Sequence, residues 1–265
     1  MTTLQEHFQL TGSPFPRLPH PGAILHHQGL EEVLARLHFA LERDTIALLV
    51  AECGCGKSTA LSLFAKSLDA SSHQIITLSL TTLGPFSLIS AIATSLGLRP
   101  RRFKGDTAAA LLGHLRSLPR RVVLLADEAH LLPDASLEDL RLLTADDFDR
   151  RSPFSLVLCG QPLLRDRLAE PRHLALAQRI GVRLRLRPLA EAEVAAFLDL
   201  HLQAAGASGT LFDAQAIATI FHHSRGIPRL VQNLALASAL AAHSLGATTI
   251  DQTIVQQAVV DLEDL

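Results

Sequence analysis

A short apolar run that leads directly into a glycine-rich loop constrains the fold of this chain more than any other feature. Residues 46–59 read IALLVAECGCGKST. The pattern G-x-x-x-x-G-K-[ST] after an apolar run is typical of a strand, a loop that wraps phosphate groups, and a helix. Ala51 stands at the first glycine of this pattern. Because alanine adds only one methyl group at the end of the strand, we expect the loop to keep its phosphate-binding shape.

The residues after Ala51 have the properties that phosphate binding requires. Gly54 and Gly56 leave the crowded turn without side chains, so backbone N–H groups can point at the phosphates. Lys57 is expected to reach the terminal phosphates, and the Ser58 hydroxyl is expected to bind Mg²⁺. The predicted nucleotide-binding residues are Glu52, Cys53, Gly54, Cys55, Gly56, Lys57, Ser58 and Thr59.

The two cysteines of the loop have two interpretations. Cys53 and Cys55 are either small loop residues whose side chains point away from the phosphates, or thiols that the following helix N-terminus makes sensitive to oxidation. We favour the first interpretation. The second stays open at this point.

A second apolar run, RVVLLADEAH at residues 121–130, ends in two adjacent acids. Adjacent buried carboxylates are costly unless a cation or another partner compensates them. Asp127 is therefore expected to hold Mg²⁺ through its water shell, together with Ser58. Glu128 is expected to orient and polarise the attacking water as a general base. The two motifs together predict a site that hydrolyses a nucleotide.

Strand and helix patterns alternate over the first two thirds of the chain. Apolar runs predict strands at residues 46–50, 74–80, 121–130, 154–162 and 182–188. Helical spacing or position predicts helices at residues 30–43, 58–70, 86–96 and 107–117. This alternation predicts an α/β fold with a parallel five-stranded sheet that is covered on both faces. The strict alternation of VRLRLRP (182–188) is typical of an edge strand with one face in water.

From about residue 189 the strand signals stop, and four amphipathic or apolar segments predict helices. Three of these segments end in glycine, which is a common helix stop. We therefore divide the chain into an irregular N-terminal lead-in (1–28), an α/β nucleotide-binding domain (29–188) and a small C-terminal helical domain (189–265).

The composition limits how the chain can bind nucleic acid. Its formal net charge is −2, so a nucleic acid must bind a local patch. Trp and Tyr are absent, which argues against single-strand readers that stack bases on aromatic rings. The best patch is RPRRFKG, which contributes Arg99, Arg101, Arg102 and Lys104 as candidate DNA-binding residues. A solvated, positively charged loop is the alternative interpretation.

The sequence also predicts a cellular setting. The N-terminal residues show no basic region followed by an apolar stretch, as a signal peptide would. No apolar run approaches the ~20 residues that span a bilayer. The three cysteines indicate neither a disulfide framework nor a zinc site. We therefore expect a cytoplasmic protein without membrane association.

In their order along the chain, these motifs resemble those of the AAA+ ATPases. The resemblance is closer to the ExeA-like group, which is similar in turn to the transposon ATPases TniB, TnsC and MuB. The resemblance covers nearly the whole chain, and its departures are Ala51 and the two loop cysteines. It implies a P-loop AAA+ fold, ATP with Mg²⁺ as the bound nucleotide, and ATPase activity. The segments that carry it are EHFQLTGSPF, LLVAECGCGKST, VVLLADEAHLL, LRLLTADDFDRRSPFSLVLCGQPLLRDRL, LAQRIGVRLRLRPL and GIPRLVQNL.

The resemblance also implies roles for three further residues. Gln161 matches the sensor-1 region and would align the attacking water, although Asn, Ser or Thr is more usual there. Arg229 matches sensor 2, which contacts the γ-phosphate. Arg179 matches the arginine finger, which acts on the nucleotide of a neighbouring subunit and so implies a homo-oligomer, either a ring or a helical filament. Alternatives for the finger are Arg183, Arg172 and Arg151.

The leading hypothesis is an ATPase of a mobile element that oligomerises on double-stranded DNA with ATP bound. It would recruit or activate a transposase, and hydrolysis would clear it from the DNA. One alternative is an ExeA-type ATPase that assists assembly of a secretion complex; we expect the lack of a transmembrane segment and of an envelope-binding domain to count against it. Another alternative is a nucleotide-gated protein scaffold that barely hydrolyses ATP.

Overall fold

The computed structural model describes residues 3–16, 21–79, 83–145 and 152–263. The chain forms two compact units, which are described separately here. The sheet unit comprises Gly29–Cys53 and Lys57–Leu186. The helical unit comprises Met1–Gln28, Gly54–Gly56 and Arg187–Leu265.

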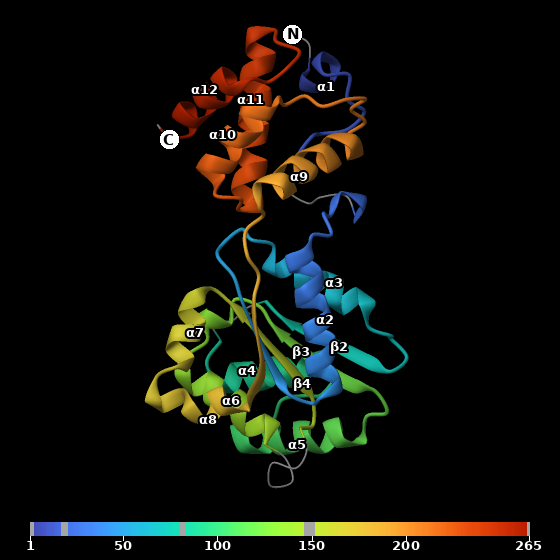
Figure 1. The fold of residues 1–265 in the computed structure, drawn as a ribbon. Coiled ribbons are helices and arrows are strands. Elements are labelled where there is room, and N and C mark those ends of the chain that lie inside the picture. The colour runs from blue at the N-terminus through green and yellow to red at the C-terminus, as the bar shows by residue number, and fades with distance from the viewer. Residues whose placement is uncertain (1–2, 17–20, 80–82, 146–151, 264–265) are drawn as a thin grey trace. The chain divides into compact units, whose positions relative to one another are not determined.

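The sheet unit is built on five parallel strands in the order β2-β3-β4-β1-β5 (Figure 1). The predicted parallel five-stranded sheet is therefore confirmed. Because the strands are parallel, their carboxyl ends lie at one edge of the sheet, which we call the carboxyl edge. The strands are β1 (Ile46–Val50), β2 (His73–Leu78), β3 (Arg121–Ala126), β4 (Ser155–Gly160) and β5 (Ile180–Arg185).

Helices cover both faces of the sheet, which explains why its central strands are apolar throughout. One face packs against α4, α5, α6 and α7 in a continuous apolar core. The other face packs against α2 and α3, where Leu37 and Phe64 lie next to Val123. The helices of this unit are α2 (Gln28–Glu42), α3 (Lys57–Ser67), α4 (Pro85–Ser95), α5 (Lys104–Ser117), α6 (Asp134–Thr144), α7 (Pro162–Leu168) and α8 (Leu174–Arg179).

The strand boundaries differ from the sequence predictions at their carboxyl ends. The strand expected at residues 121–130 ends at Ala126, because Glu128 has a left-handed backbone conformation (φ 51°) and a 3-10 turn, Ala129–Leu131, follows it. The strand expected at 74–80 ends at Leu78, and residue 80 lies outside the described residues. The predicted edge strand is confirmed, because β5 is the last strand of the sheet and alternate residues along it are buried.

The helical unit contains the four helices that the sequence predicts after residue 189. They are α9 (Glu191–Ala204), α10 (Ala214–Ser224), α11 (Pro228–Leu245) and α12 (Gln252–Glu263). Gly206, Gly226 and Gly246 follow the first three of them with positive φ, as expected for glycine helix stops.

The N-terminal segment is more ordered than the irregular lead-in that the sequence predicts. It forms a short helix, α1 (Leu4–His7), and a 3-10 turn, Pro21–Ala23. Phe8, Leu10 and Phe15 are buried in the core of the helical unit. Backbone contacts fix the segment there, since the N–H groups of residues 11 and 12 both donate to the Ala205 carbonyl. The sequence did not indicate this burial, because these apolar residues have no helical or strand period among the prolines and glycines around them.

A close approach at Gly226 allows a direct test of the packing in the helical unit. A Cβ at Gly226 would lie 1.9 Å from the Leu189 carbonyl oxygen, whereas a Cβ at Gly246 would meet nothing within 4 Å. Both glycines have a φ near 70°. We expect Gly246→Ala to lower the free energy of unfolding by about 1 kcal/mol, the cost of the left-handed conformation alone. Gly226→Ala should cost at least about 3 kcal/mol. Urea unfolding followed by circular dichroism measures both, and equal losses would contradict the packing at Leu189.

Candidate active site

The glycine-rich loop follows β1 and ends where α3 begins at Lys57. Gly54 and Gly56 have φ values of 84° and 91°, a region that favours glycine. The Lys57 side chain is 5% exposed, and its Nζ donates to the carbonyl oxygens of Ala51 (3.0 Å) and Glu52 (3.1 Å). The ammonium group therefore lies along the loop itself, where it can exchange these carbonyl contacts for phosphate oxygens.

The two sequence motifs meet at the carboxyl edge of the sheet. The Ser58 hydroxyl donates to Asp127 Oδ2 at 2.7 Å, although 69 residues separate them. The other carboxylate oxygen of Asp127 accepts the backbone N–H of Glu128 at 2.8 Å. A hydroxyl and a carboxylate are the hard oxygen ligands that Mg²⁺ prefers. Ser58 and Asp127 thus fit the predicted metal position and would hold Mg²⁺, which neutralises phosphate charge when bound.

Glu128 follows Asp127 in the left-handed conformation, which is uncommon for residues other than glycine. Its side chain is 39% exposed, so a water molecule can reach the carboxylate. Backbone strain of this kind occurs at functional sites where the surrounding structure imposes it. The arrangement suits a general base that receives a proton from water.

Two residues near these acids had no role in the sequence predictions. His130 places its Nδ1 3.4 Å from Glu128 Oε2. Cys159, on β4, is fully buried, and burial together with the nearby Asp127 carboxylate raises the pKa of its thiol. Sequence gave no signal for Cys159, because a cysteine in an apolar strand looks like any other core residue. His130 was visible within the DEAH segment, but only the folded turn brings its ring to Glu128.

Gln161 and Arg179 lie at opposite ends of the parallel strands: Gln161 at the carboxyl ends and Arg179 at the amino ends. Gln161 directly follows β4, and β4 lies between β3 and β1, so Gln161 starts at the carboxyl edge. Arg179 directly precedes β5, whose first residue pairs with Ile46 at the start of β1. At about 3.3 Å per residue, the length of β5 separates Arg179 from the carboxyl edge by about 17 Å.

The alternatives to Arg179 differ in their contacts. Arg172 binds the carboxylates of Asp134 and Glu170, and Arg183 donates to the Ala177 carbonyl at 2.9 Å. Arg151 lies outside the described residues.

Arg229 is the second residue of α11 in the helical unit. That unit also includes Gly54–Gly56, and the backbone N–H of Arg229 donates to the Gly54 carbonyl at 3.3 Å. A Cβ at Gly54 would lie 2.9 Å from the Arg229 Cβ, so this approach requires glycine at that position.

The remaining predicted site residues have different degrees of exposure. Cys53 is exposed and Cys55 is buried. The side chains of Arg99, Arg101 and Arg102 are exposed on the segment between α4 and α5. Lys104, by contrast, forms an ion pair with Asp139 at 2.6 Å, so part of its charge is already compensated.

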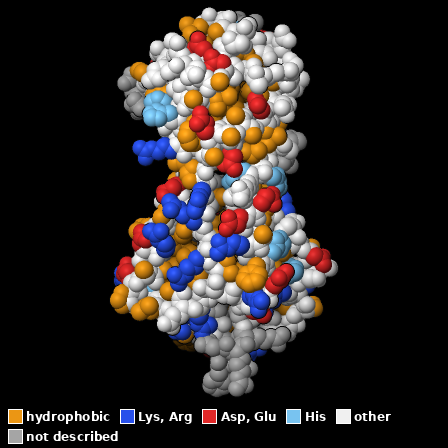
Figure 2. Space-filling view, viewed as in Figure 1, with side chains coloured by type: hydrophobic (Ala, Val, Ile, Leu, Met, Phe, Trp, Pro, Cys, Tyr) orange, Lys and Arg blue, Asp and Glu red, His pale blue; other side chains and the backbone are white. Residues whose placement is uncertain are grey.

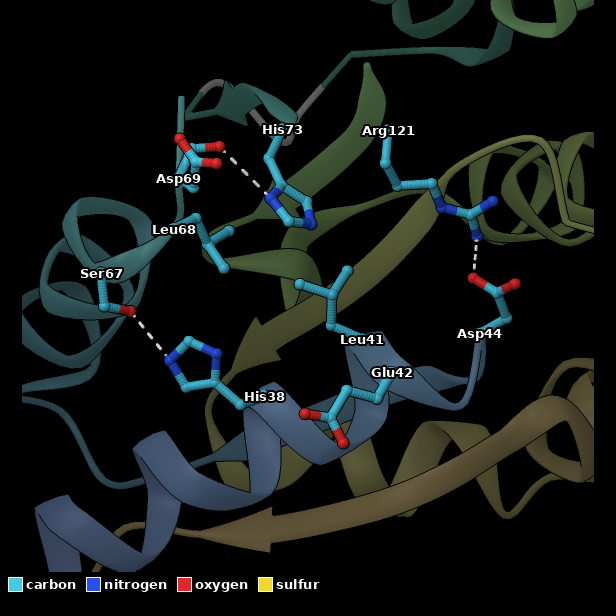
Figure 3. Close-up of a pocket in the computed structure, with 9 residues that line it drawn as sticks. All are labelled: His38, Leu41, Glu42, Asp44, Ser67, Leu68, Asp69, His73 and Arg121. Carbon is cyan, nitrogen blue, oxygen red and sulfur yellow. Dashed lines mark hydrogen bonds and ion pairs between the residues drawn. The ribbon is translucent and has the colours of Figure 1, made fainter. Parts of the chain in front are cut away.

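A separate cavity of about 390 Å³ lies at the amino ends of β2 and β3, away from the carboxyl edge (Figure 3). His73 and Arg121, the first residues of these strands, line it. The Arg121 guanidinium pairs with Asp44, and His38 contacts the Ser67 hydroxyl. Since it is at the opposite edge from Ser58 and Asp127, this cavity is not part of the candidate active site.

Comparison with known proteins shows what the segment that carries this site is similar to. Residues 40–168, which contain both the glycine-rich loop and the Asp127-Glu128 pair, match the family described as "AAA domain". General secretion pathway protein A of Aeromonas hydrophila is 32% identical over 250 residues, which are 92% of this chain and 45% of that protein. The chain therefore spans about half the length of this relative.

The structure is similar to solved structures that share this fold at low sequence identity. The ORC1 protein of Aeropyrum pernix in complex with DNA has a TM-score of 0.68 and 21% identity, with 91% of this chain and 66% of that chain covered. The ORC2 protein of Aeropyrum pernix, in ADPNP–ADP complexes, has a TM-score of 0.66 and 14% identity, with 93% and 70% covered. The RuvB Holliday junction branch migration motor of Thermotoga maritima has a TM-score of 0.60 and 24% identity, with 94% and 73% covered.

These similarities confirm the P-loop AAA+ fold that the sequence predicts. The similarity to a secretion pathway protein agrees with the ExeA-like part of the sequence resemblance. The transposon ATPases do not appear among these proteins. Among the described residues, no helix combines the length and the apolar character needed to cross a membrane.

The position of Lys57 leads to a test of the loop. Lys57 is the lysine of the loop, and removing its ammonium group removes the charged hydrogen bonds that it would donate to the phosphates. Lys57→Ala should therefore weaken ATP binding at least about a hundredfold. Lys66→Ala is the matched control, because Lys66 is an exposed lysine near the end of the same helix. Binding of a fluorescent ATP analogue measures both variants. Unchanged affinity in Lys57→Ala would contradict the assignment of the loop.

Proposed function

We propose that this protein is a Mg²⁺-dependent ATPase that assembles as a homo-oligomer on double-stranded DNA in its ATP-bound state. The observation that carries the ATPase part is the contact between Ser58 and Asp127, with Lys57 in the preceding loop and Glu128 beside Asp127. In this proposal Lys57 and the loop N–H groups hold the phosphates, and Ser58 and Asp127 hold Mg²⁺. Glu128 accepts the proton of the attacking water, which Gln161 helps to align.

The position of Arg179 supports the oligomer. Arg179 precedes β5 at the amino edge of the sheet, while the loop follows β1 at the carboxyl edge. The intervening strand is longer than an arginine side chain, so Arg179 cannot reach the nucleotide of its own sheet unit. An arginine finger acts across a subunit boundary and stabilises charge that develops on the transferred phosphoryl group. We therefore assign Arg179 to the neighbour's nucleotide, and Arg229 to the γ-phosphate as sensor 2.

A mixing experiment tests the assignment of Arg179. Arg179→Ala lacks the finger and Lys57→Ala lacks nucleotide, so each alone should lose at least about a thousandfold in turnover. In an equimolar mixture, half of the subunits have an intact loop, and half of these loops meet an intact finger from the neighbouring subunit. About a quarter of wild-type turnover should therefore return. Arg165→Ala, which removes an exposed arginine of α7, is the control. A mixture no more active than its separate components would contradict the role of Arg179.

The DNA part of the proposal rests on exposed cations and on what similar structures bind. Figure 2 shows several Lys and Arg side chains on the visible face of the sheet unit, with a few acids among them. The exposed Arg99, Arg101 and Arg102 are a further set that can contact phosphates. Two similar structures, the Aeropyrum pernix ORC1 protein and Drosophila ORC, were solved with DNA. The resemblance to transposon ATPases supports a transposase as the protein partner. With DNA and a transposase as its partners, the protein would act in the cytoplasm.

A DNA-binding measurement tests this part. In mobility shifts with duplex DNA, ATP should give tighter binding than ADP or no nucleotide. Arg99→Ala/Arg101→Ala/Arg102→Ala should weaken the ATP-dependent binding and lower its salt slope by about 2 to 3, because three phosphate contacts are lost. The control is a triple alanine variant at other exposed arginines of the sheet unit: Arg36, Arg43 and Arg120. Absent DNA binding would contradict assembly on DNA. Equal binding in all nucleotide states would contradict its dependence on ATP.

The 32% identity to General secretion pathway protein A favours a second candidate function. In that case the same ATPase would serve a secretion pathway, and its partner would be another protein of that pathway. Absent DNA binding together with intact ATP hydrolysis is the result expected for it. A nucleotide-gated scaffold is the third candidate, and it predicts that wild type and Glu128→Gln show the same negligible turnover.

A further inference from the structure

A buried histidine lies beside the proposed general base. The His130 side chain is 8% exposed, and its Nδ1 is 3.4 Å from Glu128 Oε2. Within the part of the chain that the structure describes, this Nδ1 has no hydrogen-bond partner. A buried polar atom without a partner is costly, so its presence needs an explanation. A small rotation of the Glu128 carboxylate, which is partly exposed, would bring it within hydrogen-bond distance of Nδ1.

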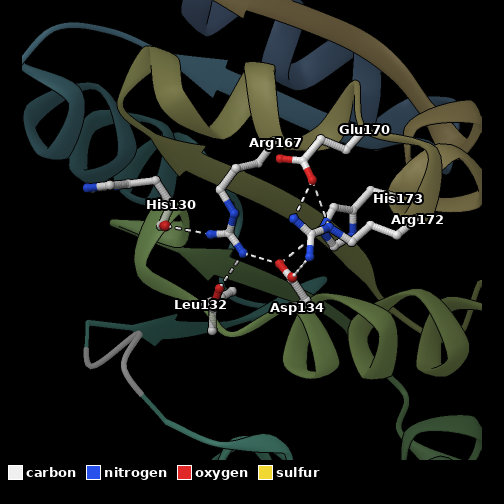
Figure 4. Close-up of polar contacts among 7 residues, drawn as sticks. All are labelled: His130, Leu132, Asp134, Arg167, Glu170, Arg172 and His173. Atoms are coloured by element: carbon white, nitrogen blue, oxygen red, sulfur yellow. Dashed lines mark hydrogen bonds and ion pairs between the residues drawn. The ribbon is translucent and has the colours of Figure 1, made fainter.

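The backbone of His130 is held by contacts from a different helix. Arg167, on α7, donates from Nη1 to the His130 carbonyl at 2.6 Å and from Nη2 to the Leu132 carbonyl at 2.9 Å. Figure 4 shows the His130 carbonyl directed toward the Arg167 guanidinium, while the imidazole ring extends away from it. One planar guanidinium therefore binds two carbonyls, those of His130 and Leu132, in the segment that follows Glu128.

The guanidinium of Arg167 is itself fixed by Asp134. Asp134 also contacts His173 at 3.0 Å and Arg172 at 2.8 Å (Figure 4). The Arg167 hydrogen bond holds the pKa of Asp134 below its usual value. The network joins the start of α6 to α7 and to the turn before α8.

The end of β4 restricts His130 from another side. A Cβ at Gly160 would lie 3.1 Å from the His130 backbone nitrogen and 3.4 Å from its Cβ. Glycine at the end of β4 thus allows the turn to pack directly against the sheet. Together with Arg167, this contact restricts the backbone of His130 from two sides.

We propose that His130 is a positioning residue for the hydrolysis reaction: its Nδ1–H donates a hydrogen bond to the Glu128 carboxylate and holds it in the orientation that polarises the attacking water. This inference rests on the proposed ATPase function and names a further residue of the same site. The hydrogen bond forms when the carboxylate turns toward its substrate water, since catalytic hydrogen bonds are often long without substrate. Arg167 sets the position from which His130 acts.

Three substitutions separate a hydrogen bond from packing. His130→Leu keeps the bulk and removes the donor. His130→Asn places an amide nitrogen at the same distance from the backbone as Nδ1, whereas His130→Gln places it one bond farther out. His114→Leu is the matched control, because His114 is a half-buried histidine on α5. Steady-state turnover, ATP affinity and the melting temperature are measured for each variant, with Glu128→Gln as the reference for lost turnover.

We expect His130→Leu and His130→Gln to lower kcat by about tenfold or more, because a displaced catalytic group costs that much. ATP affinity should stay within about twofold, because in this proposal His130 acts on Glu128 and not on the nucleotide. His130→Asn should keep kcat within about threefold of wild type. A role in packing alone predicts instead that kcat follows the melting temperature and that Asn, which fills less space than Leu, is the worse variant.

The outcomes separate this inference from the proposed function. Wild-type turnover that equals that of Glu128→Gln overturns the ATPase proposal and the role of His130 with it. Turnover that is lost in Glu128→Gln but kept in His130→Leu overturns the role of His130 alone. Equal loss of kcat in His130→Asn and His130→Leu, at unchanged melting temperature, also overturns it, because the donor at the Nδ1 position would then be irrelevant.

Discussion

The hydrogen bond between the Ser58 hydroxyl and the Asp127 carboxylate is the contact on which the candidate active site depends. It joins the first turn of α3 to the end of β3, two segments that are distant in sequence. The contact exists because β1 and β3 run in the same direction, with β4 between them, and so end at the same edge. The proposed metal-binding pair thus follows from strand direction, which itself follows from the helices that connect the strands.

The residues around this pair are fixed mainly by backbone geometry. Gly56 adopts a positive φ in the loop, and Glu128 adopts one although it is not glycine. Gly160 lets the turn at His130 approach β4 closely, and Arg167 binds that turn through two carbonyls. The proposed general base therefore lies on a short strained turn, which contacts from two other elements hold in place. Such a turn keeps a carboxylate in place without burying it, which is what a base that must meet water requires.

Sequence patterns predicted the sheet well because its central strands are buried on both faces and read as continuous apolar runs. IALLV at residues 46–50 gives β1 with its bounds unchanged, and the alternation of VRLRLRP identified the edge strand. The short helices α7 and α8 were not predicted as separate elements, because helices of seven and six residues are too short to show a period. The burial of three apolar residues in the N-terminal segment was missed for a related reason: these residues lie in irregular structure.

The sequence by itself determined the chemistry of the candidate site: a lysine and a hydroxyl after a glycine-rich loop, and two acids after an apolar strand, have few other uses. Local patterns suffice there because each motif is a continuous segment whose residue types are set by phosphate and metal binding. Only the tertiary structure decided how residues outside these motifs are placed relative to them. The contact of Arg167 with the segment that carries His130, and the place of Arg179 at the amino end of β5, depend on strand order and on close packing. No single segment of the sequence encodes those distances, because they arise where separate elements meet.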